Sequence, residues 1–362
     1  MLASLRNMLC VTAAACLAFA PTANACTSFL IKTENGDPIY GRTMEFGVPL
    51  KSNIVVVPRG LKYEASTLPD NTGWSWEGKY AATGMNVLGT PYIVDGVNEK
   101  GLTGGILYFP GYAGYVAPDK ADPKKAIAPW EFLSWVLTNF ATTDEVRQAL
   151  SKVQITDFVP PFDIGGAKSL PFHYTLHDTN GGSIVIEPID GKLKVYDNPL
   201  GVMTNSPPFD WHMTNLKNYV KLSPVNAPPL KVDGMTIDSL GQGSGMLGVP
   251  GDPTPPSRFV RVLGYAMSAR VQPNTDEGVR MAEHILNNFD IPEGFVREGT
   301  TDEITEWSTI ADMTGKRYFF KTEDYQKLRQ VDLADFDLDA EKMVEIPIGQ
   351  TLKIEKVEAP RS

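Results

Sequence analysis

Residues 26–47 read CTSFLIKTENGDPIYGRTMEFG, and this stretch decides which fold we expect for the chain. Thr27–Lys32 and Pro38–Thr43 are rich in β-branched and aromatic residues, which favour strands. Glu34–Asp37 lies between them and contains Asn-Gly, a strong signal for a tight hairpin turn. The stretch therefore predicts an antiparallel β-hairpin that starts directly after Cys26.

The residues before Cys26 differ from the rest of the chain. A single charge at Arg6 precedes an apolar run over Met8–Ala20, which is shorter than the ~20 residues that a membrane-spanning helix needs. Ala23-Asn24-Ala25 then has the small-x-small pattern that signal peptidase cleaves. We predict that residues 1–25 are a signal peptide, that cleavage makes Cys26 the first residue, and that the mature protein is periplasmic or secreted.

The remaining residues, 26–362, are predicted to form one domain. Segments with strand character and segments with helical periodicity alternate in blocks, joined by hairpin turns rather than by βαβ crossovers. This order favours an α+β domain with antiparallel sheets. Further strands are expected at 53–57, 92–97, 102–109, 172–177, 183–187, 192–196, 201–205, 317–321 and 351–357, and helices at 129–140, 144–153, 258–270 and 275–289.

Composition excludes several classes of partner. The formal net charge is −10 and no block of Lys and Arg is present, so phosphate backbones would repel the protein and no nucleic-acid partner is expected. No later segment has 18 consecutive apolar residues, so no membrane association is expected after signal cleavage. Gly243–Gly248 matches the glycine pattern of dinucleotide-binding loops, but prolines follow where a helix should begin. We therefore expect no cofactor.

The cysteines point to the chemistry. The chain has three, and Cys10 and Cys16 lie in the predicted signal peptide, so the mature protein has a single thiol at its first residue. An α-amine titrates near ~7.7–8.0, so the amine of an N-terminal cysteine can take the proton of its own thiol without a histidine. Two alternatives remain open, namely that Cys26 is lipidated in an anchored lipoprotein or that its thiol is chemically idle.

Four blocks of sequence together resemble the choloylglycine hydrolase family, the penicillin V acylases and bile salt hydrolases among the N-terminal nucleophile hydrolases. The blocks are CTSFLIKTENGDPIYGRTMEFG, VDGVNEKGLTGGILYFPGYAGY, GVMTNSPPFDWHMTNLKNY and PGDPTPPSRFVR, in this order along the chain. The resemblance implies an αββα sandwich of two antiparallel sheets between helical layers, often assembled as a homotetramer. It also implies an amidase that cleaves a linear amide in a small molecule, without a metal or other cofactor.

The resemblance also assigns roles to residues of the blocks. Cys26 is the nucleophile and its α-amine the base, and Arg42 lies beside the thiol, where a fixed cation favours thiolate. Asn205 donates to the oxyanion through its side-chain amide. Arg258 matches the second arginine of the active site.

Two further positions are informative about substrate and mechanism. Tyr108 falls where the family contributes a backbone N–H to the oxyanion, and penicillin V acylases tend to have Tyr there while bile salt hydrolases tend to have Asn. Glu45 departs from the family, which usually has Asp there to hold the α-amine. The predicted activity is penicillin V acylase-like, with bile salt hydrolase or N-acyl homoserine lactone acylase as alternatives. A catalytically inactive exported binding protein is the alternative from another class.

Overall fold

The computed structural model describes residues 25–70, 73–164, 166–350, 352, 354 and 356. The predicted signal peptide, apart from Ala25, lies outside the described residues, as does most of the strand expected at 351–357. Within the described residues the chain still contains Ala25, so the backbone nitrogen of Cys26 is an amide.

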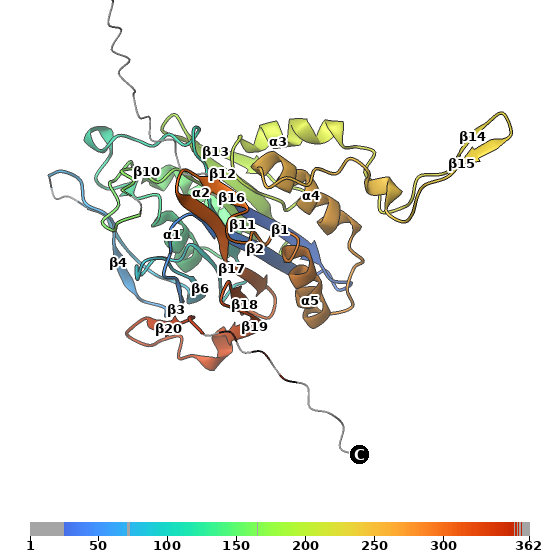
Figure 1. The fold of residues 1–362 in the computed structure, drawn as a ribbon. Coiled ribbons are helices and arrows are strands. Elements are labelled where there is room, and N and C mark those ends of the chain that lie inside the picture. Colours follow the sequence, from blue (N-terminus) through green and yellow to red (C-terminus); the bar gives the residue numbers. More distant parts are fainter. Residues whose placement is uncertain are drawn as a thin grey trace, which may run out of the picture.

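Two antiparallel sheets form the centre of the molecule (Figure 1). The strands of the first sheet follow the order β1-β2-β17-β18-β19, and β16 pairs with β17. The second sheet has the order β13-β12-β11-β8-β7-β6-β3-β20. Their bounds are β1 Cys26–Lys32, β2 Pro38–Phe46, β16 Val296–Glu298, β17 Thr301–Asp312, β18 Arg317–Thr322, β19 Tyr325–Asp332, β3 Asn53–Val57, β6 Ala82–Met85, β7 Asp95–Asn98, β8 Thr103–Tyr108, β11 Phe172–His177, β12 Ser183–Ile189, β13 Lys192–Asp197 and β20 Val344–Pro347.

Helices cover the outer faces of both sheets. α4 (Pro255–Ser268) contacts β1, and α5 (Thr275–Leu286) contacts β1, β2 and β17 of the first sheet. α1 (Phe132–Asn139) contacts β7 and β8 of the second sheet. The layers are therefore helix, sheet, sheet and helix, the expected αββα sandwich. The smaller elements are α2 Thr143–Ala149, α3 Phe209–Asn215, β4 Lys62–Glu64, β5 Ser75–Glu77, β9 Ala126–Ile127, β10 Gln154–Ile155, β14 Leu230–Val232, β15 Met235–Ile237 and five short 3₁₀ turns at 118–120, 150–152, 216–218, 244–246 and 333–335.

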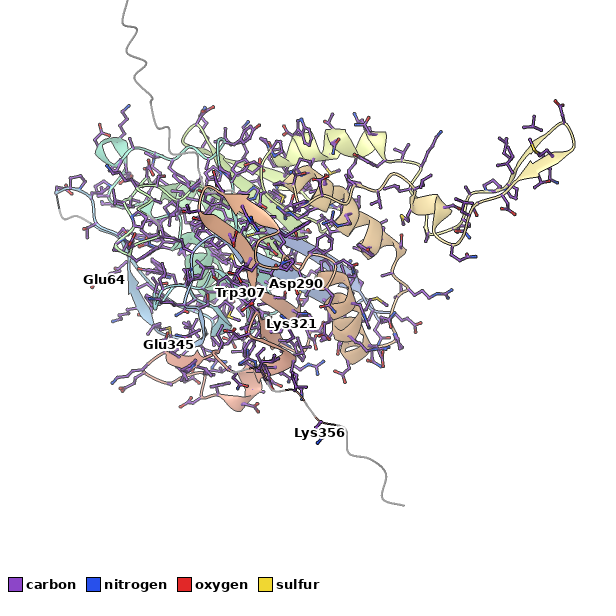
Figure 2. All side chains as sticks on the ribbon, in the orientation of Figure 1. Glu64, Asp290, Trp307, Lys321, Glu345 and Lys356 are labelled. Carbon is purple, nitrogen blue, oxygen red and sulfur yellow. The ribbon has the colours of Figure 1, made fainter. Side chains whose placement is uncertain are left out.

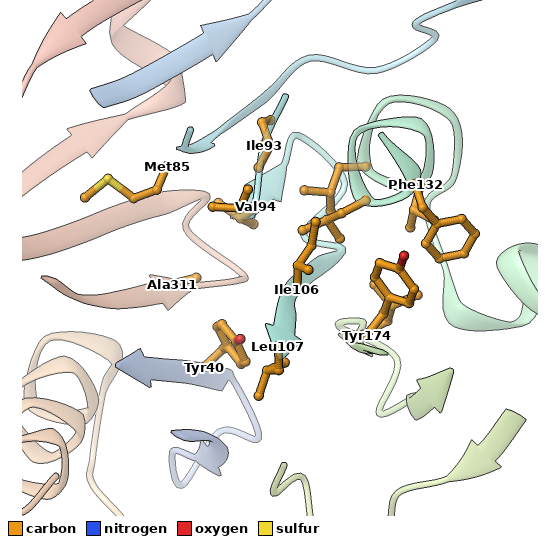
Figure 3. Close-up of a cluster of buried hydrophobic side chains, with 14 of the residues drawn as sticks. Tyr40, Met85, Ile93, Val94, Ile106, Leu107, Phe132, Tyr174 and Ala311 are labelled. Carbon is orange, nitrogen blue, oxygen red and sulfur yellow. The ribbon is translucent and has the colours of Figure 1, made fainter. Parts of the chain in front are cut away.

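The core fills both faces of the second sheet (Figure 3). On the face toward α1, the ring of Phe132 packs 4.5 Å from the ring of Tyr174, measured between centroids. On the other face, Tyr40 of β2 reaches Gly105 of β8, where a Cβ atom would lie 2.7 Å from the Tyr40 hydroxyl. Glycine at this position therefore lets the two sheets approach closely beside the start of β1.

Most predicted elements are present, and the exceptions have physical reasons. The hairpin forms with Cys26 opposite Met44 and Lys32 opposite Pro38. The strand expected at 201–205 is reduced to an isolated bridge between Met203 and Ser28, because two prolines that cannot donate to a sheet follow at 207 and 208. The long strand β17 was not predicted, since its many polar residues disfavour strands in isolation.

A long arm projects from the sandwich. It carries the hairpin β14–β15, and its side chains stand clear of the other layers (Figures 1 and 2). Leu230, Val232, Met235 and Ile237 of this hairpin are all exposed. This hairpin was not among the predicted strands, because its strands are short and stabilised by no core. Among the described residues, no helix combines the length and apolar character needed to cross a bilayer.

Candidate active site

Cys26 is the first residue of β1, and its side chain is 2% exposed and not in a disulfide. Its register partner on β2 is Met44, and Arg42 lies two residues earlier on the same face, since side chains alternate along a strand. As a result Arg42 Nη2 lies 3.4 Å from the Cys26 sulfur. The hairpin thus brings the predicted cation to the predicted nucleophile.

The guanidinium of Arg42 is fixed between the two sheets. Its Nη1 donates to Val94 O at 2.9 Å and its Nη2 to Ile106 O at 2.5 Å, and the ring of Trp307 lies 5.3 Å from its central carbon. Burial opposes the charge of Arg42, but the negative charges of Cys26 and Asp95 outweigh burial and raise its pKa. Arg42 therefore remains a cation beside the thiol.

Asp95 is a site residue that the sequence did not single out. One of its carboxylate oxygens lies 3.5 Å from Arg42 Nη1 and accepts from Tyr40 OH at 3.1 Å. The other accepts from Thr309 Oγ1 at 2.8 Å and from Tyr318 OH at 2.6 Å. Asp95 occurs in the quoted block VDGVNEKGL, but only the sheet contacts reveal that it holds Arg42.

Asn205 connects three of the predicted residues. Its Oδ1 accepts from the backbone N–H of Cys26 at 2.8 Å and from Arg258 Nη2 at 2.6 Å, and its Nδ2 donates to Tyr108 O at 2.8 Å. An amide nitrogen carries two N–H groups, so one is left to donate to an oxyanion. The placement of the amide is compatible with the predicted role, which stays a prediction.

Two buried histidines hold the segment that carries Asn205. His212 Nε2 lies 2.9 Å from the carbonyl oxygen of Asn205 itself, and His173 Nε2 lies 3.0 Å from that of Thr204. A carbonyl oxygen only accepts, so both Nε2 atoms carry the proton. Burial lowers the pKa of His212 to about 4, which keeps this ring neutral at ordinary pH. These anchoring residues were not predicted, because no sequence motif marks either contact.

Arg258 joins α4 to the start of β1. Its Nη1 donates to Cys26 O at 2.5 Å and to Thr27 Oγ1 at 2.8 Å, and its Nε donates to Pro253 O at 2.8 Å. The side chain is buried, and burial lowers its pKa against the opposing influence of Glu45. The predicted second arginine is therefore in direct contact with the backbone of the nucleophile.

Glu45 is on β2, next to the start of β1, and it is fully buried. Its backbone N–H donates to Ala25 O at 2.9 Å, and its Oε1 accepts from Thr305 Oγ1 at 3.1 Å. Its Oε2 has no hydrogen-bond partner among the described residues. Burial raises the pKa of Glu45 to about 8. The Cys26 nitrogen donates to Asn205 Oδ1 instead, so the predicted contact of Glu45 with the α-amine stays a prediction.

A second buried carboxylate, Glu303 on β17, was not predicted. The backbone N–H of Ala25 donates to its Oε1. Burial raises the pKa of Glu303 to about 7. The only trace in the sequence is an acidic residue inside the strand TDEITEWSTIAD, which has no motif around it.

An apolar pocket opens beside the thiol, with a cavity of about 40 Å³. The ring of Tyr108 lies in its wall, edge-on to Phe46 at 6.4 Å and to Phe172 at 6.3 Å between centroids. Such a pocket suits the apolar acyl part of an amide substrate. Its lining consists of Cys26, Met44, Phe46, Leu50, Val87, Val94, Ile106, Tyr108, Trp130, Phe162, Ile164, Leu170 and Phe172.

Comparison with known proteins gives the same family as the quoted blocks. The family model of linear amide C–N hydrolases, choloylglycine hydrolase family, matches residues 26–346. A bile salt hydrolase/transferase of Clostridium perfringens is 34% identical over 92% of this chain and 99% of its own length. A penicillin V acylase of Pectobacterium atrosepticum is 29% identical over 85% of this chain and 81% of its own length.

A solved structure supports the fold. A variant of conjugated bile acid hydrolase from Clostridium perfringens superposes with a TM-score of 0.81 at 31% identity, over 92% of this chain and all of that chain. The expected N-terminal nucleophile hydrolase sandwich and the expected amidase class are both confirmed. The chain belongs to the choloylglycine hydrolase family of linear amide C–N hydrolases.

Proposed function

We propose that the protein hydrolyses the amide bond of glycine- or taurine-conjugated bile salts, with the thiol of Cys26 as the nucleophile. The apolar pocket that begins at Cys26 carries the proposal, because its apolar and aromatic lining suits an apolar acyl group beside the thiol. The bile salt hydrolase relative supports this substrate over penicillin V, since its identity and coverage both exceed those of the penicillin V acylase.

The proposed reaction begins when the α-amine of mature Cys26 takes the thiol proton. The thiolate, which Arg42 stabilises from 3.4 Å, attacks the carbonyl carbon of the amide. The negative oxygen that forms accepts from the Asn205 amide and from the Tyr108 backbone N–H. The ammonium of Cys26 then protonates the leaving amine, and water releases the acyl group from the thioester with the amine as base.

The substrate test compares kcat/KM for glycocholate, taurocholate and phenoxymethylpenicillin on one preparation of the mature enzyme. These ratios compare transition-state binding directly. We expect a conjugated bile salt to exceed phenoxymethylpenicillin by tenfold or more, about 1.4 kcal/mol. A preference of that size for phenoxymethylpenicillin would overturn the bile salt proposal and leave the amidase intact.

Penicillin V acylase activity is the second candidate, and the aromatic wall of the pocket favours it. Tyr108 sits between Phe46 and Phe172, and edge-to-face rings of this kind suit a flat phenoxy group. An N-acyl homoserine lactone would place its straight acyl chain in the same pocket. Including one such lactone in the comparison separates all three acyl groups.

Maturation is part of the proposal. We propose that residues 1–25 direct export to the periplasm or beyond, and that cleavage after Ala25 frees the amine of Cys26. The intact mass of protein from an exporting host should equal that of a chain starting at Cys26, without a lipid, and should rise by one adduct after iodoacetamide. A lipid mass, or a failure to alkylate with no turnover, would instead support the lipoprotein or the inactive binding protein.

We also propose that the protein is a homotetramer and that the arm takes part in its assembly. The four exposed apolar residues of β14–β15 form a surface that a monomer would leave in water. Light scattering after gel filtration should give the mass of four chains. Replacing Leu230 and Ile237 together by Ser should reduce this mass, and an unchanged mass would exclude the hairpin from the interface.

A further inference from the structure

We infer that Glu303, together with Glu45, forms a receptor of two carboxylates for the α-ammonium of mature Cys26, with Glu303 as a positioning residue. The inference rests on the proposed cleavage after Ala25. It adds to the reaction a residue on β17 that no sequence motif marks.

The strand register places both carboxylates on one face of the first sheet. Glu45 pairs with Thr305 across β2 and β17, and Glu303 is two residues before Thr305, so its side chain leaves the sheet on the same side. Ala25 continues β1 opposite Glu45, as shown by the Glu45 N–H bond to Ala25 O. The Cys26 side chain points to the opposite face, so both carboxylates lie behind the backbone of Cys26 rather than beside its thiol.

The contacts of Ala25 show that Glu303 can reach the amine. Glu303 Oε1 accepts from the Ala25 backbone N–H, and the Cys26 nitrogen is the next backbone nitrogen, at most about 3.6 Å further along an extended chain. Removal of Ala25 takes away this donor and creates an ammonium group one residue away. A small change in the Glu303 side chain then suffices to bond it.

The number of donors and acceptors also agrees. An ammonium group has three N–H donors. Asn205 Oδ1 already accepts from the Cys26 nitrogen, Glu45 Oε2 is buried with no hydrogen-bond partner among the described residues, and Glu303 Oε1 loses its donor on cleavage. Three acceptors are thus available for three donors.

The charges at this place favour a further cation. Glu45 and Glu303 are both buried, and the other charged groups near them are Arg258 on α4 and Glu298 on β16. The guanidinium of Arg258 donates its hydrogen bonds to oxygens of Cys26, Thr27, Asn205 and Pro253 rather than to either carboxylate. Arg42, the other buried cation nearby, is paired with Asp95. Burial raises the pKa of both carboxyl groups and the charge of Arg258 lowers it, and the ammonium of mature Cys26 adds a cation that can donate hydrogen bonds to them.

The acid limb of the pH profile of kcat/KM tests the inference. Carboxylates stabilise the ammonium form, so loss of one lowers the pKa of the amine, and the free base persists to lower pH. Glu303→Gln should therefore move the acid limb of kcat/KM down by about 1 pH unit. Glu303→Asp keeps the negative charge but places it one methylene further from the α-amine. It should therefore shift the acid limb by a smaller amount in the same direction. The control is Glu306→Gln, a half-buried glutamate on the same strand, which should leave the limb in place.

Thermal unfolding gives a readout that needs no substrate. We would compare the mature chain with a chain that retains residues 23–25, each with and without Glu303→Gln. At pH 7 the substitution should lower Tm of the mature chain by several degrees more than that of the extended chain, which has no ammonium at Cys26. An acid limb unmoved by both Glu303 variants, or equal Tm changes in the two chains, would overturn the inference. Absence of turnover in the wild type would instead refute the proposed function and leave the Tm comparison valid.

Discussion

The guanidinium of Arg42 and the carboxylate of Asp95 lie 3.5 Å apart, and both side chains are completely buried. Arg42 comes from the first sheet and Asp95 from the second, so this ion pair joins the two halves of the sandwich. The same guanidinium reaches the Cys26 sulfur at 3.4 Å. The position of the cation beside the nucleophile therefore depends on the packing of the two sheets.

Asp95→Asn should destabilise the fold strongly, because it leaves the charge of Arg42 buried without its partner. Breaking a buried ion pair from one side typically costs about 3–5 kcal/mol. Tyr318→Phe, which removes only the hydroxyl that donates to the carboxylate and to the backbone carbonyl of Asp95, should cost about 1 kcal/mol. Urea unfolding of both variants measures the difference, and equal losses would show that the charge of Asp95 is unimportant.

Cys26→Ala should abolish turnover while the protein stays folded, because the side chain contributes little to the core beyond a small volume. Cys26→Ser should fold and react much more slowly, since a hydroxyl is a far weaker nucleophile at neutral pH. Single-turnover kinetics and circular dichroism on the same samples test both statements. Normal turnover of Cys26→Ala would remove Cys26 from the mechanism.

Asn205→Ala should lower kcat by about 10²–10³, the usual effect of losing an oxyanion donor. The same substitution removes the acceptor for the Cys26 nitrogen and for Arg258, so a loss at the upper end is expected. The split between kcat and KM decides the role. An unchanged kcat would leave Asn205 with a structural role in its turn.

Phe172→Ala should raise KM for a bile salt or an aryl amide with a smaller effect on kcat. Burying one large apolar side chain contributes about 1.5–3 kcal/mol, so an increase in KM of about tenfold or more is expected if the ring contacts the acyl group. Phe140→Ala is the matched control, since Phe140 is half-buried and does not line the pocket. Equal effects of the two substitutions would mean that the pocket does not bind the acyl group.

His212 should make stability depend on pH in a predictable direction. The pKa of His212 in the folded protein is about 4, below the ordinary value of a histidine. The contribution of this ring to the free energy of unfolding is therefore complete above pH ~6.5 and is lost as the pH falls to about 4. His212→Gln should therefore differ most from the wild type at pH 7.5, and the difference in Tm should shrink toward pH 4. His284→Gln, at an exposed position on α5, is the matched control. A difference that stays constant with pH would assign the effect to packing.

The sequence by itself determined the start of the fold and the class of chemistry. Asn-Gly between two strand-forming segments specifies the β1–β2 hairpin, because this turn depends on neighbouring residues only. The period of two along β2 then places Arg42 on the face of Cys26. Both relationships are local, and the four quoted blocks added the family and its site residues.

Only the tertiary structure decided what surrounds these residues. Asp95 pairs with Arg42, Glu303 accepts from Ala25, and His212 donates to the carbonyl of Asn205. These contacts depend on how sheets and loops pack, and no local pattern encodes them. β17 is a strand because neighbours on both sides satisfy its backbone and cover it, although its polar residues disfavour a strand in isolation. Burial likewise raises the pKa of Glu45 and Glu303, since desolvation depends on every residue that excludes water from them.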